Sequence, residues 1–356
     1  MSSQPETMPT LAQRADASYL DFVEGFREYI LGKGADFEDR LNEELLAEER
    51  RRGRKWQELE EIRAHVHGLP LGRLRDRLAR TQQEMKWHTL KRSFEAQRQS
   101  LTEQLEHWDT RGPGRLELDP QFVHPPYVNV HFHLQPAGYY KDELSGYLYH
   151  YGTKVFFRGD NDHDELHAKL VARVPAPADA RVERILDLAC SIGQSSTAFK
   201  RRFPAAAVTG IDYSAPMLRV AHRRAAMQGD DVTFAQRLVE KTGYADGQFD
   251  ITFAFIVFHE LPLRIIHETV REAARVTRKG GIFAVYDFTG TRDKSPFQRY
   301  HRWFDARHNG EPYSQDFCDC DFDRILADNG FRVAAAPVAQ RSGGAGYMSH
   351  WFATRE

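Results

Sequence analysis

Two stretches of this 356-residue sequence place residues where they could bind a nucleoside. Residues 185–196, ILDLACSIGQSS, have the pattern of a buried strand, a loop of small residues and the start of a helix. Small side chains let a ligand approach the backbone, and the first turn of a helix has N–H donors without intrahelical partners. A second strand ends at Asp212, whose carboxylate can accept both hydroxyls of a ribose. Together these features predict a nucleoside cofactor at the carboxyl edge of a parallel sheet.

The loop of small residues distinguishes two classes of nucleoside cofactor. A dinucleotide site requires G-x-G-x-x-G, but the corresponding positions hold Ala189, Ser191 and Gln194. The glycine that approaches the pyrophosphate is therefore missing, which weakens the case for an NAD-dependent oxidoreductase. The spacing has instead the form acid-x-small-x-small-x-Gly, from Asp187 to Gly193.

The elements that position these residues alternate between strands and helices. Strands are predicted at residues 183–189, 206–212, 231–235, 249–255 and 281–287, and helices at 194–202, 215–228, 264–278 and 320–329. This alternation is typical of a parallel sheet with helices on both faces. Two last strands, 331–340 and 346–356, predict an antiparallel hairpin. We therefore expect an α/β fold: a Rossmann-like, seven-stranded, mostly parallel sheet with a terminal antiparallel hairpin, plus an N-terminal α-helical domain.

Residues 15–109 have helical composition, with many Glu, Arg, Leu and Gln residues and few β-branched ones. Gly68 and Pro70 separate a predicted helix through 43–66 from a second at 71–108. The second carries an apolar stripe from Leu71 to Trp108 that includes Leu74. We expect three segments: a helical lid or dimerisation domain at 1–115, an aromatic and histidine-rich connecting and lid segment at 116–178, and the α/β domain at 179–356.

Over about 180–356, roughly half of the chain, the sequence resembles the class I S-adenosyl-L-methionine-dependent methyltransferases. The resemblance is to the small-molecule group called methyltransferase type 11 or 25. The matching segments, in order, are ILDLACSIGQSS, VTGIDYSAPML, DVTFAQRLVEKTGYADGQFDI, FHELP, REAARVTRKGG and NGEPYSQDF. The resemblance implies transfer of a methyl group from S-adenosylmethionine to an oxygen, nitrogen or carbon atom of a small organic acceptor, such as a secondary metabolite. An NAD-dependent oxidoreductase and a non-catalytic S-adenosylmethionine-binding regulatory protein remain as alternatives.

The resemblance also assigns residues to the cofactor. It places the ribose on Asp212 and the methionine portion at Asp187 and the loop that follows, where small residues replace the family's first two glycines. Leu238 stands where family members often carry an acid, so adenine recognition would rest on backbone groups and apolar packing. The expected cofactor contacts are Asp187, Ala189, Ser191, Gly193, Asp212, Tyr213, Met217, Leu238, Val239 and Phe255.

The acceptor side is expected to come from three segments that precede or follow the sheet strands. His259, directly after the fourth predicted strand, and Tyr313 are the candidate catalytic bases, because each could take a proton from a hydroxyl or nitrogen acceptor. Aromatic side chains could stack on an acceptor or contact the sulfonium. The candidate substrate contacts are Tyr139, Tyr140, Tyr151, Arg158, Trp303, Asn309 and Glu311.

Two groups of histidines could suggest a metal site. His131 and His133 form an H-x-H pair, and His163 and His167 share one helix face. Neither group is a complete ligand set, and the resembled family generally needs no metal. We therefore expect no bound metal.

Composition limits the partners and the compartment. Lys and Arg total 49 and Asp and Glu total 51, so no excess charge favours nucleic acid or an acidic membrane. Three cysteines cannot form a disulfide framework for this length, and the first thirty residues lack a signal-peptide pattern. We expect a soluble, cytoplasmic protein that acts on a small molecule and pairs as a homodimer through its N-terminal helices.

Overall fold

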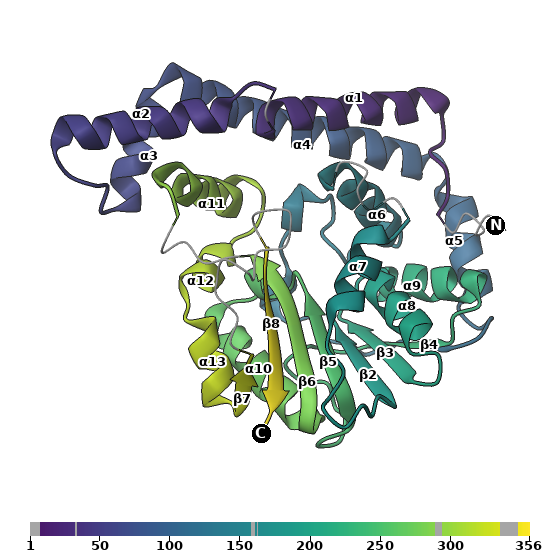
Figure 1. Ribbon diagram of the computed structural model, residues 1–356. Coiled ribbons are helices and arrows are strands. Elements are labelled where there is room, and N and C mark those ends of the chain that lie inside the picture. The colour runs from purple at the N-terminus through teal and green to yellow at the C-terminus, as the bar shows by residue number, and fades with distance from the viewer. Residues whose placement is uncertain (1–7, 33, 158–160, 162, 289–293, 335–347) are drawn as a thin grey trace.

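The centre of the molecule is an eight-stranded mixed sheet, seen in a computed structural model that describes residues 8–32, 34–157, 161, 163–288, 294–334 and 348–356 (Figure 1). The strand order is β1-β4-β3-β2-β5-β6-β8-β7. The strands are β1 (Arg115–Glu117), β2 (Arg184–Leu188), β3 (Ala207–Asp212), β4 (Val232–Gln236), β5 (Phe249–Phe255), β6 (Thr277–Phe288), β7 (Phe331–Val333) and β8 (Met348–Arg355). The predicted α/β class is confirmed, including the antiparallel pairing of β7 with β8. β1, which pairs in parallel with β4 at the edge, is an additional strand that the sequence analysis did not predict.

The strand order creates a crevice between β2 and β5. From β2 the chain builds β3 and β4 on one side, and it then returns to place β5 on the other side of β2. Loops that leave two neighbouring parallel strands in opposite directions open a ligand-binding crevice at their carboxyl ends. Six of the seven side chains of β5 are buried, as expected for a central strand that is covered on both faces.

Helices cover both faces of the sheet, and each face has its own apolar core. One core packs α10 (Leu263–Val276), α12 (Ser314–Asp319) and α13 (Phe322–Asp328) against the sheet. The other packs α7 (Glu165–Arg173), α8 (Gln194–Arg202) and α9 (Ala215–Gln228). These layers hold the carboxyl ends of β2, β3 and β5 in fixed positions.

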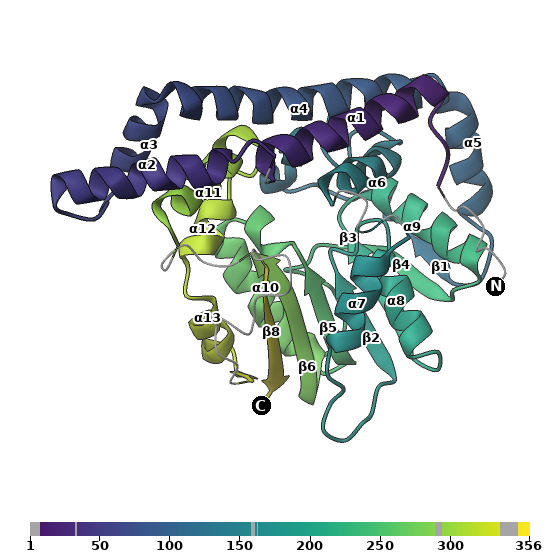
Figure 2. The same ribbon diagram turned by 45° about the horizontal axis from the view of Figure 1, so that its top comes forward.

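The first four of the five N-terminal helices lie across the carboxyl ends of the parallel strands, and the fifth descends beside α9; α1 and α4 run side by side in both views (Figures 1 and 2). They are α1 (Arg14–Leu31), α2 (Phe37–Arg52), α3 (Leu59–Gly68), α4 (Pro70–Glu95) and α5 (Arg98–Trp108). Each of the two predicted long helices is therefore divided in two. The first ends at Gly53, which adopts φ +68° in the left-handed region that favours glycine. No helix among the described residues is both long and apolar enough to cross a membrane.

Two further apolar clusters join these helices to the rest of the chain. One contains Trp87, Leu90 and Phe94 of α4 with Met217 of α9. The other contains residues of α2 and α3 with Phe297 of α11 (Pro296–His308), which follows the sheet strand β6. The helical segment is thus packed on the α/β segment near both of its ends. The predicted division at residues 115 and 178 stays a prediction.

Candidate functional site

A cavity lies at the carboxyl ends of β2, β3 and β5, with α4 and α6 (Ser145–Phe156) on its opposite side. It encloses about 1260 Å³ of empty space, part of which is continuous with solvent. Small-molecule and cofactor sites are concave and mostly apolar, with a few polar groups that orient the ligand, and aromatic side chains with a few polar ones line this cavity.

The loop after β2 is held in an unusual backbone conformation. Ala189 and Ser191, which line the cavity, have φ of +53° and +51°. Gly193 has φ +78°, and a Cβ there would lie 2.7 Å from the ring of Phe234. Left-handed backbone at non-glycine residues is strained and concentrates at functional sites. Ala189 and Ser191 reach the cavity from a loop held in this conformation.

Asp212, at the end of β3, is fixed against this loop. Its Oδ2 accepts a hydrogen bond from the Ser191 N–H at 3.0 Å, and its Oδ1 accepts one from the Ser214 N–H at 2.9 Å. Burial raises the pKa of the Asp212 carboxyl to about 6, against the lowering effect of these two backbone donors. Each carboxylate oxygen keeps a lone pair for a further donor, and the residue lines the cavity.

Most of the predicted cofactor contacts line the same cavity. The described lining includes Ala189, Ser191, Asp212, Tyr213, Met217, Leu238, Val239 and Phe255. The hydroxyl of Tyr213 is buried and has no hydrogen-bond partner among the described residues. A buried polar atom without a partner is uncommon, which fits a polar ligand at this position.

Two predicted cofactor contacts lie behind the cavity wall. Asp187 is buried and accepts a hydrogen bond from the hydroxyl of Ser196 at 2.6 Å. Burial raises the pKa of Asp187 to about 7. Gly193 begins α8 and packs on Phe234. In the described structure both residues support the loop rather than forming the cavity lining.

Only some of the predicted acceptor contacts reach the cavity. Tyr139 lines it, and its hydroxyl donates a hydrogen bond to Glu260 Oε1 at 3.0 Å. Tyr140 instead stacks on His124 with ring centroids 4.0 Å apart, and the Tyr151 hydroxyl donates to the carbonyl of Pro9 at 2.9 Å. Both rings pack in the connection between helices and sheet. Aromatic composition alone did not distinguish these packing roles from contact with the cavity.

Two other predicted acceptor contacts lie away from the cavity or outside the described residues. Trp303 of α11 packs against His67 of α3, with ring centroids 5.5 Å apart, and belongs to the cluster that joins α11 to the N-terminal helices. Arg158 lies outside the described residues.

The two candidate bases are also absent from the described cavity lining. His259 is fully buried, and its Nδ1 lies 2.9 Å from Asp287 Oδ1. Burial lowers the pKa of His259, but the charge and hydrogen bond of Asp287 together with the charges of Glu260 and Glu311 outweigh it, and the net shift is upward. The Tyr313 hydroxyl donates to the carbonyl of Tyr127 at 3.3 Å. The Tyr313 hydroxyl is therefore engaged, whereas His259 keeps Nε2 without a hydrogen-bond partner among the described residues.

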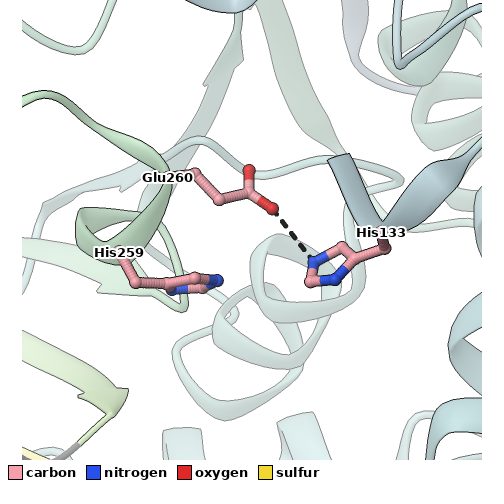
Figure 3. Close-up of side chains that lie close together, drawn as sticks. All are labelled: His133, His259 and Glu260. Atoms are coloured by element: carbon pink, nitrogen blue, oxygen red, sulfur yellow. Dashed lines mark ion pairs between the residues drawn. The ribbon is translucent and has the colours of Figure 1, made fainter. Parts of the chain in front are cut away.

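A polar cluster that the sequence analysis did not predict lies at the wall of the cavity (Figure 3). His133 Nε2 lies 3.1 Å from Glu260 Oε1, and His133 Nδ1 lies 3.1 Å from Glu311 Oε1. Asn309 donates to Glu311 at 2.8 Å and accepts from Gln83 of α4 at 2.7 Å. Asn309 and Glu311 therefore act within this cluster and line a second, adjoining cavity.

α4 contributes polar side chains that composition did not single out. Gln83, Lys86 and Trp87 line the cavity, and Lys86 is 2% exposed. Burial, together with the charge of Arg27, lowers the pKa of Lys86 well below its usual range. The Trp87 indole N–H donates a hydrogen bond to the backbone carbonyl of His133 at 2.7 Å, which fixes the backbone of the histidine against α4.

The chain resembles known proteins over its central part. Residues 185–281 match the methyltransferase domain family. The sequence is 35% identical over 106 residues to the ubiquinone/menaquinone biosynthesis C-methyltransferase of Bdellovibrio bacteriovorus, covering 30% of this chain and 44% of that protein. It is 35% identical over 109 residues to the demethylmenaquinone methyltransferase of Thermus thermophilus, covering 30% and 47%. The chain thus spans about half the length of the curated relatives it matches.

Among solved structures, the magnesium protoporphyrin IX methyltransferase of Synechocystis with bound S-adenosylhomocysteine aligns at 20% identity and a TM-score of 0.41. The alignment covers 56% of this chain and 87% of that one. The family match contains the strained loop after β2 and the carboxylate at the end of β3. Residues 185–281 are therefore similar to a methyltransferase domain.

Proposed function

We propose that this protein transfers a methyl group from S-adenosylmethionine to a small organic acceptor. The observation that carries the proposal is the placement of Asp212. Its buried carboxylate is held by two backbone N–H groups at the edge of a cavity that also contains the strained loop after β2. The names of the curated relatives designate methyltransferases of small molecules, which supports the same class of acceptor.

The residues of the cavity divide between the parts of the cofactor. Asp212 would accept the two ribose hydroxyls, because its two backbone donors leave one lone pair free on each oxygen. Tyr213, Leu238 and Val239 would pack on the adenine. The backbone of Ala189 and Ser191 would hold the methionine portion, which needs acceptors for its ammonium group. Phe255, at the end of β5, would lie near the sulfonium.

When bound, the cofactor supplies a methyl carbon activated by a positive sulfur. The protein then has to orient the acceptor in line with this carbon and exclude water. Trp87 and Phe156, from α4 and α6, and Tyr139 and Phe288 give the remaining wall a largely aromatic character. This wall would exclude water from the face opposite the cofactor.

The cofactor assignment can be tested by calorimetric titration with S-adenosylhomocysteine and with NAD. We expect S-adenosylhomocysteine alone to bind. Asp212→Ala should weaken this binding at least tenfold, or about 1.4 kcal/mol. Asp231→Ala, an exposed aspartate just before β4, is the matched control and should leave the affinity unchanged. Binding of NAD instead, or an unaltered affinity in Asp212→Ala, would contradict the proposal.

We further propose that the protein works in the cytoplasm as a homodimer. The cytoplasm is supported by Cys190, Cys318 and Cys320, which are all free thiols in the described structure. The homodimer is supported by three large apolar side chains of α1, Tyr19, Phe22 and Tyr29, which are 38%, 58% and 53% exposed.

A further inference from the structure

Three side chains from two distant parts of the sequence direct nitrogen and oxygen donors to one point beside the cavity (Figure 3). They are His133, which lies within the connecting segment, and His259 and Glu260, which follow β5. One donor atom from each lies within 4.8 Å of the other two. Donors bound to a common ion at about 2.0–2.2 Å lie closer together than this, so small side-chain rotations would close the set around an ion.

His259 gives an independent indication that a ligand belongs at this point. The side chain is 0% exposed, and its Nε2 has no hydrogen-bond partner among the described residues. A buried polar atom left without a partner costs free energy. An electron-pair acceptor at Nε2 would remove this cost.

Each of the three donors is oriented by a further side chain. Asp287 Oδ1 lies 2.9 Å from Nδ1 of His259, and Glu311 Oε1 lies 3.1 Å from Nδ1 of His133. The Tyr139 hydroxyl donates to Glu260 at 3.0 Å. A carboxylate on the far nitrogen of a histidine fixes the tautomer that presents Nε2 as a ligand and makes that nitrogen more basic. The arrangement therefore has both the ligands and the supporting groups of a metal site.

We propose that His133 Nε2, His259 Nε2 and the Glu260 carboxylate bind one divalent transition-metal ion. Two histidines and one carboxylate are a ligand set for Fe²⁺ and for catalytic Zn²⁺, and they leave coordination positions open for another molecule. This proposal departs from the expectation of no metal, which considered only histidines close together in the sequence. The H-x-H partner, His131, is exposed and is not part of the set.

The site is placed to bind the methyl acceptor. His133 and Glu260 line the cavity that Asp212 and Phe255 also line. An ion there would take an acceptor heteroatom in an open position and lower its pKa, which favours an oxygen or nitrogen acceptor over a carbon one. This role rests on the proposed methyl transfer, whereas the ion site itself does not.

The test is direct metal binding by the full-length, tag-free protein after treatment with a chelator. Titration with Co²⁺, followed by its visible absorption, and with Zn²⁺, followed by calorimetry, should each show one equivalent per chain. His133→Gln, His259→Gln and Glu260→Gln should each lower the affinity at least about 100-fold, and Asp287→Asn should lower it roughly 10- to 100-fold. His131→Gln, two residues from a proposed ligand, is the matched control and should bind like the wild type.

The outcomes separate this inference from the proposed function. Absence of stoichiometric binding to the wild-type protein would overturn the metal site and leave His133 as an ion-paired histidine between two glutamates. Binding that persists equally in the three ligand variants, shown to be folded by circular dichroism, would overturn it as well. S-adenosylhomocysteine titrated into the metal-free wild type tests the cofactor site independently of the ion.

Discussion

The ionisation of Asp212 would make the proposed cofactor binding depend on pH. Burial raises the pKa of its carboxyl to about 6, so the protonated form begins to accumulate just below neutrality. A protonated carboxyl loses acceptor capacity and negative charge. The proposed bonds to the ribose hydroxyls therefore depend on pH within an accessible range.

We predict that the affinity for S-adenosylhomocysteine falls as the pH is lowered from 7.5 to 5, approaching a tenfold loss per pH unit below about 6. Calorimetry across this range gives the profile. Asp212→Asn should bind weakly with little dependence on pH, because the asparagine does not titrate. A wild-type profile that is flat over the same range would show that this carboxylate does not contact the ligand.

Asp187 gives a prediction about stability with a defined sign. Burial raises the pKa of its carboxyl in the folded protein to about 7, above the value of about 3.9 in an unfolded chain. The folded state therefore holds the proton more tightly, and the stability contributed by this group is full below pH 4 and lost as the pH rises through 7. Asp187→Asn should remove that loss and keep an acceptor for Ser196.

The expected difference between pH 5 and pH 8 is on the order of 2–3 kcal/mol in the free energy of unfolding, since one pKa unit corresponds to about 1.4 kcal/mol. Urea denaturation at the two pH values measures it. Asp187→Asn should gain stability relative to the wild type at pH 8 and little at pH 5, whereas Asp231→Asn, on the surface, should parallel the wild type at both. If the stability of Asp187→Asn changed between the two pH values by as much as that of the wild type, the raised pKa of Asp187 would be contradicted.

The sequence located those cavity-lining residues whose positions are set by their own strand and loop. Asp212 and the loop from Ala189 were found because a strand end and a small-residue turn are local patterns. The cluster of His133, His259 and Glu260 was not found, because only the folding of the connecting segment over β5 brings these residues together. Trp87 of α4, which bonds to the His133 carbonyl, belongs to a third segment.

At the scale of elements, α4 shows that the hydrophobic pattern predicted a helix and part of its buried face, including Leu90 and Phe94, but missed the buried polar residues. The expected apolar stripe includes Leu74, which is 50% exposed, whereas Gln83 is 6% and Lys86 2% exposed. The side of α4 that faces the cavity carries polar groups, so hydrophobicity did not mark it. β1 was missed for a different reason, since a strand of three residues is too short for its alternation to stand out in the sequence.

Replacing Lys86 tests whether this buried lysine of α4 lowers the free energy of unfolding. Burial lowers its pKa, so the unfolded chain binds more protons than the folded one and stability rises with pH toward the unfolded value of about 10.4. Lys86→Met should therefore raise the free energy of unfolding at pH 7, by about 1–2 kcal/mol, and raise it more at pH 6 than at pH 9.

Urea denaturation of Lys86→Met beside Lys91→Met measures this effect. Lys91 lies on the same helix and is exposed, so its replacement should change stability by no more than about 0.5 kcal/mol. A loss of stability in Lys86→Met would mean that the ammonium group makes favourable contacts in the folded protein.

At the scale of the whole molecule, α1 presents an apolar face away from the α/β segment. Tyr19, Phe22 and Tyr29 recur at helical spacing and are 38%, 58% and 53% exposed. Phe22 stacks on Phe26 with ring centroids 6.0 Å apart, which continues the stripe along the helix. Contiguous exposed apolar side chains on a folded protein mark an association surface. α1 lies against α4, which lines the cavity. Pairing of two chains through this face of α1 would therefore also stabilise the position of α4 at the cavity.

If α1 forms the homodimer interface, Phe22→Glu should convert a dimer into a monomer, because the dimer would bury two like charges near its axis. Sedimentation velocity over a range of protein concentrations measures the state of association. Leu263→Glu, which places a charge at another exposed apolar position at the start of α10, should leave the dimer intact. A wild-type monomer at all concentrations would contradict the pairing. A dimer that survives Phe22→Glu would place the interface elsewhere, since a charged pair at the centre of an apolar contact is too costly to be tolerated.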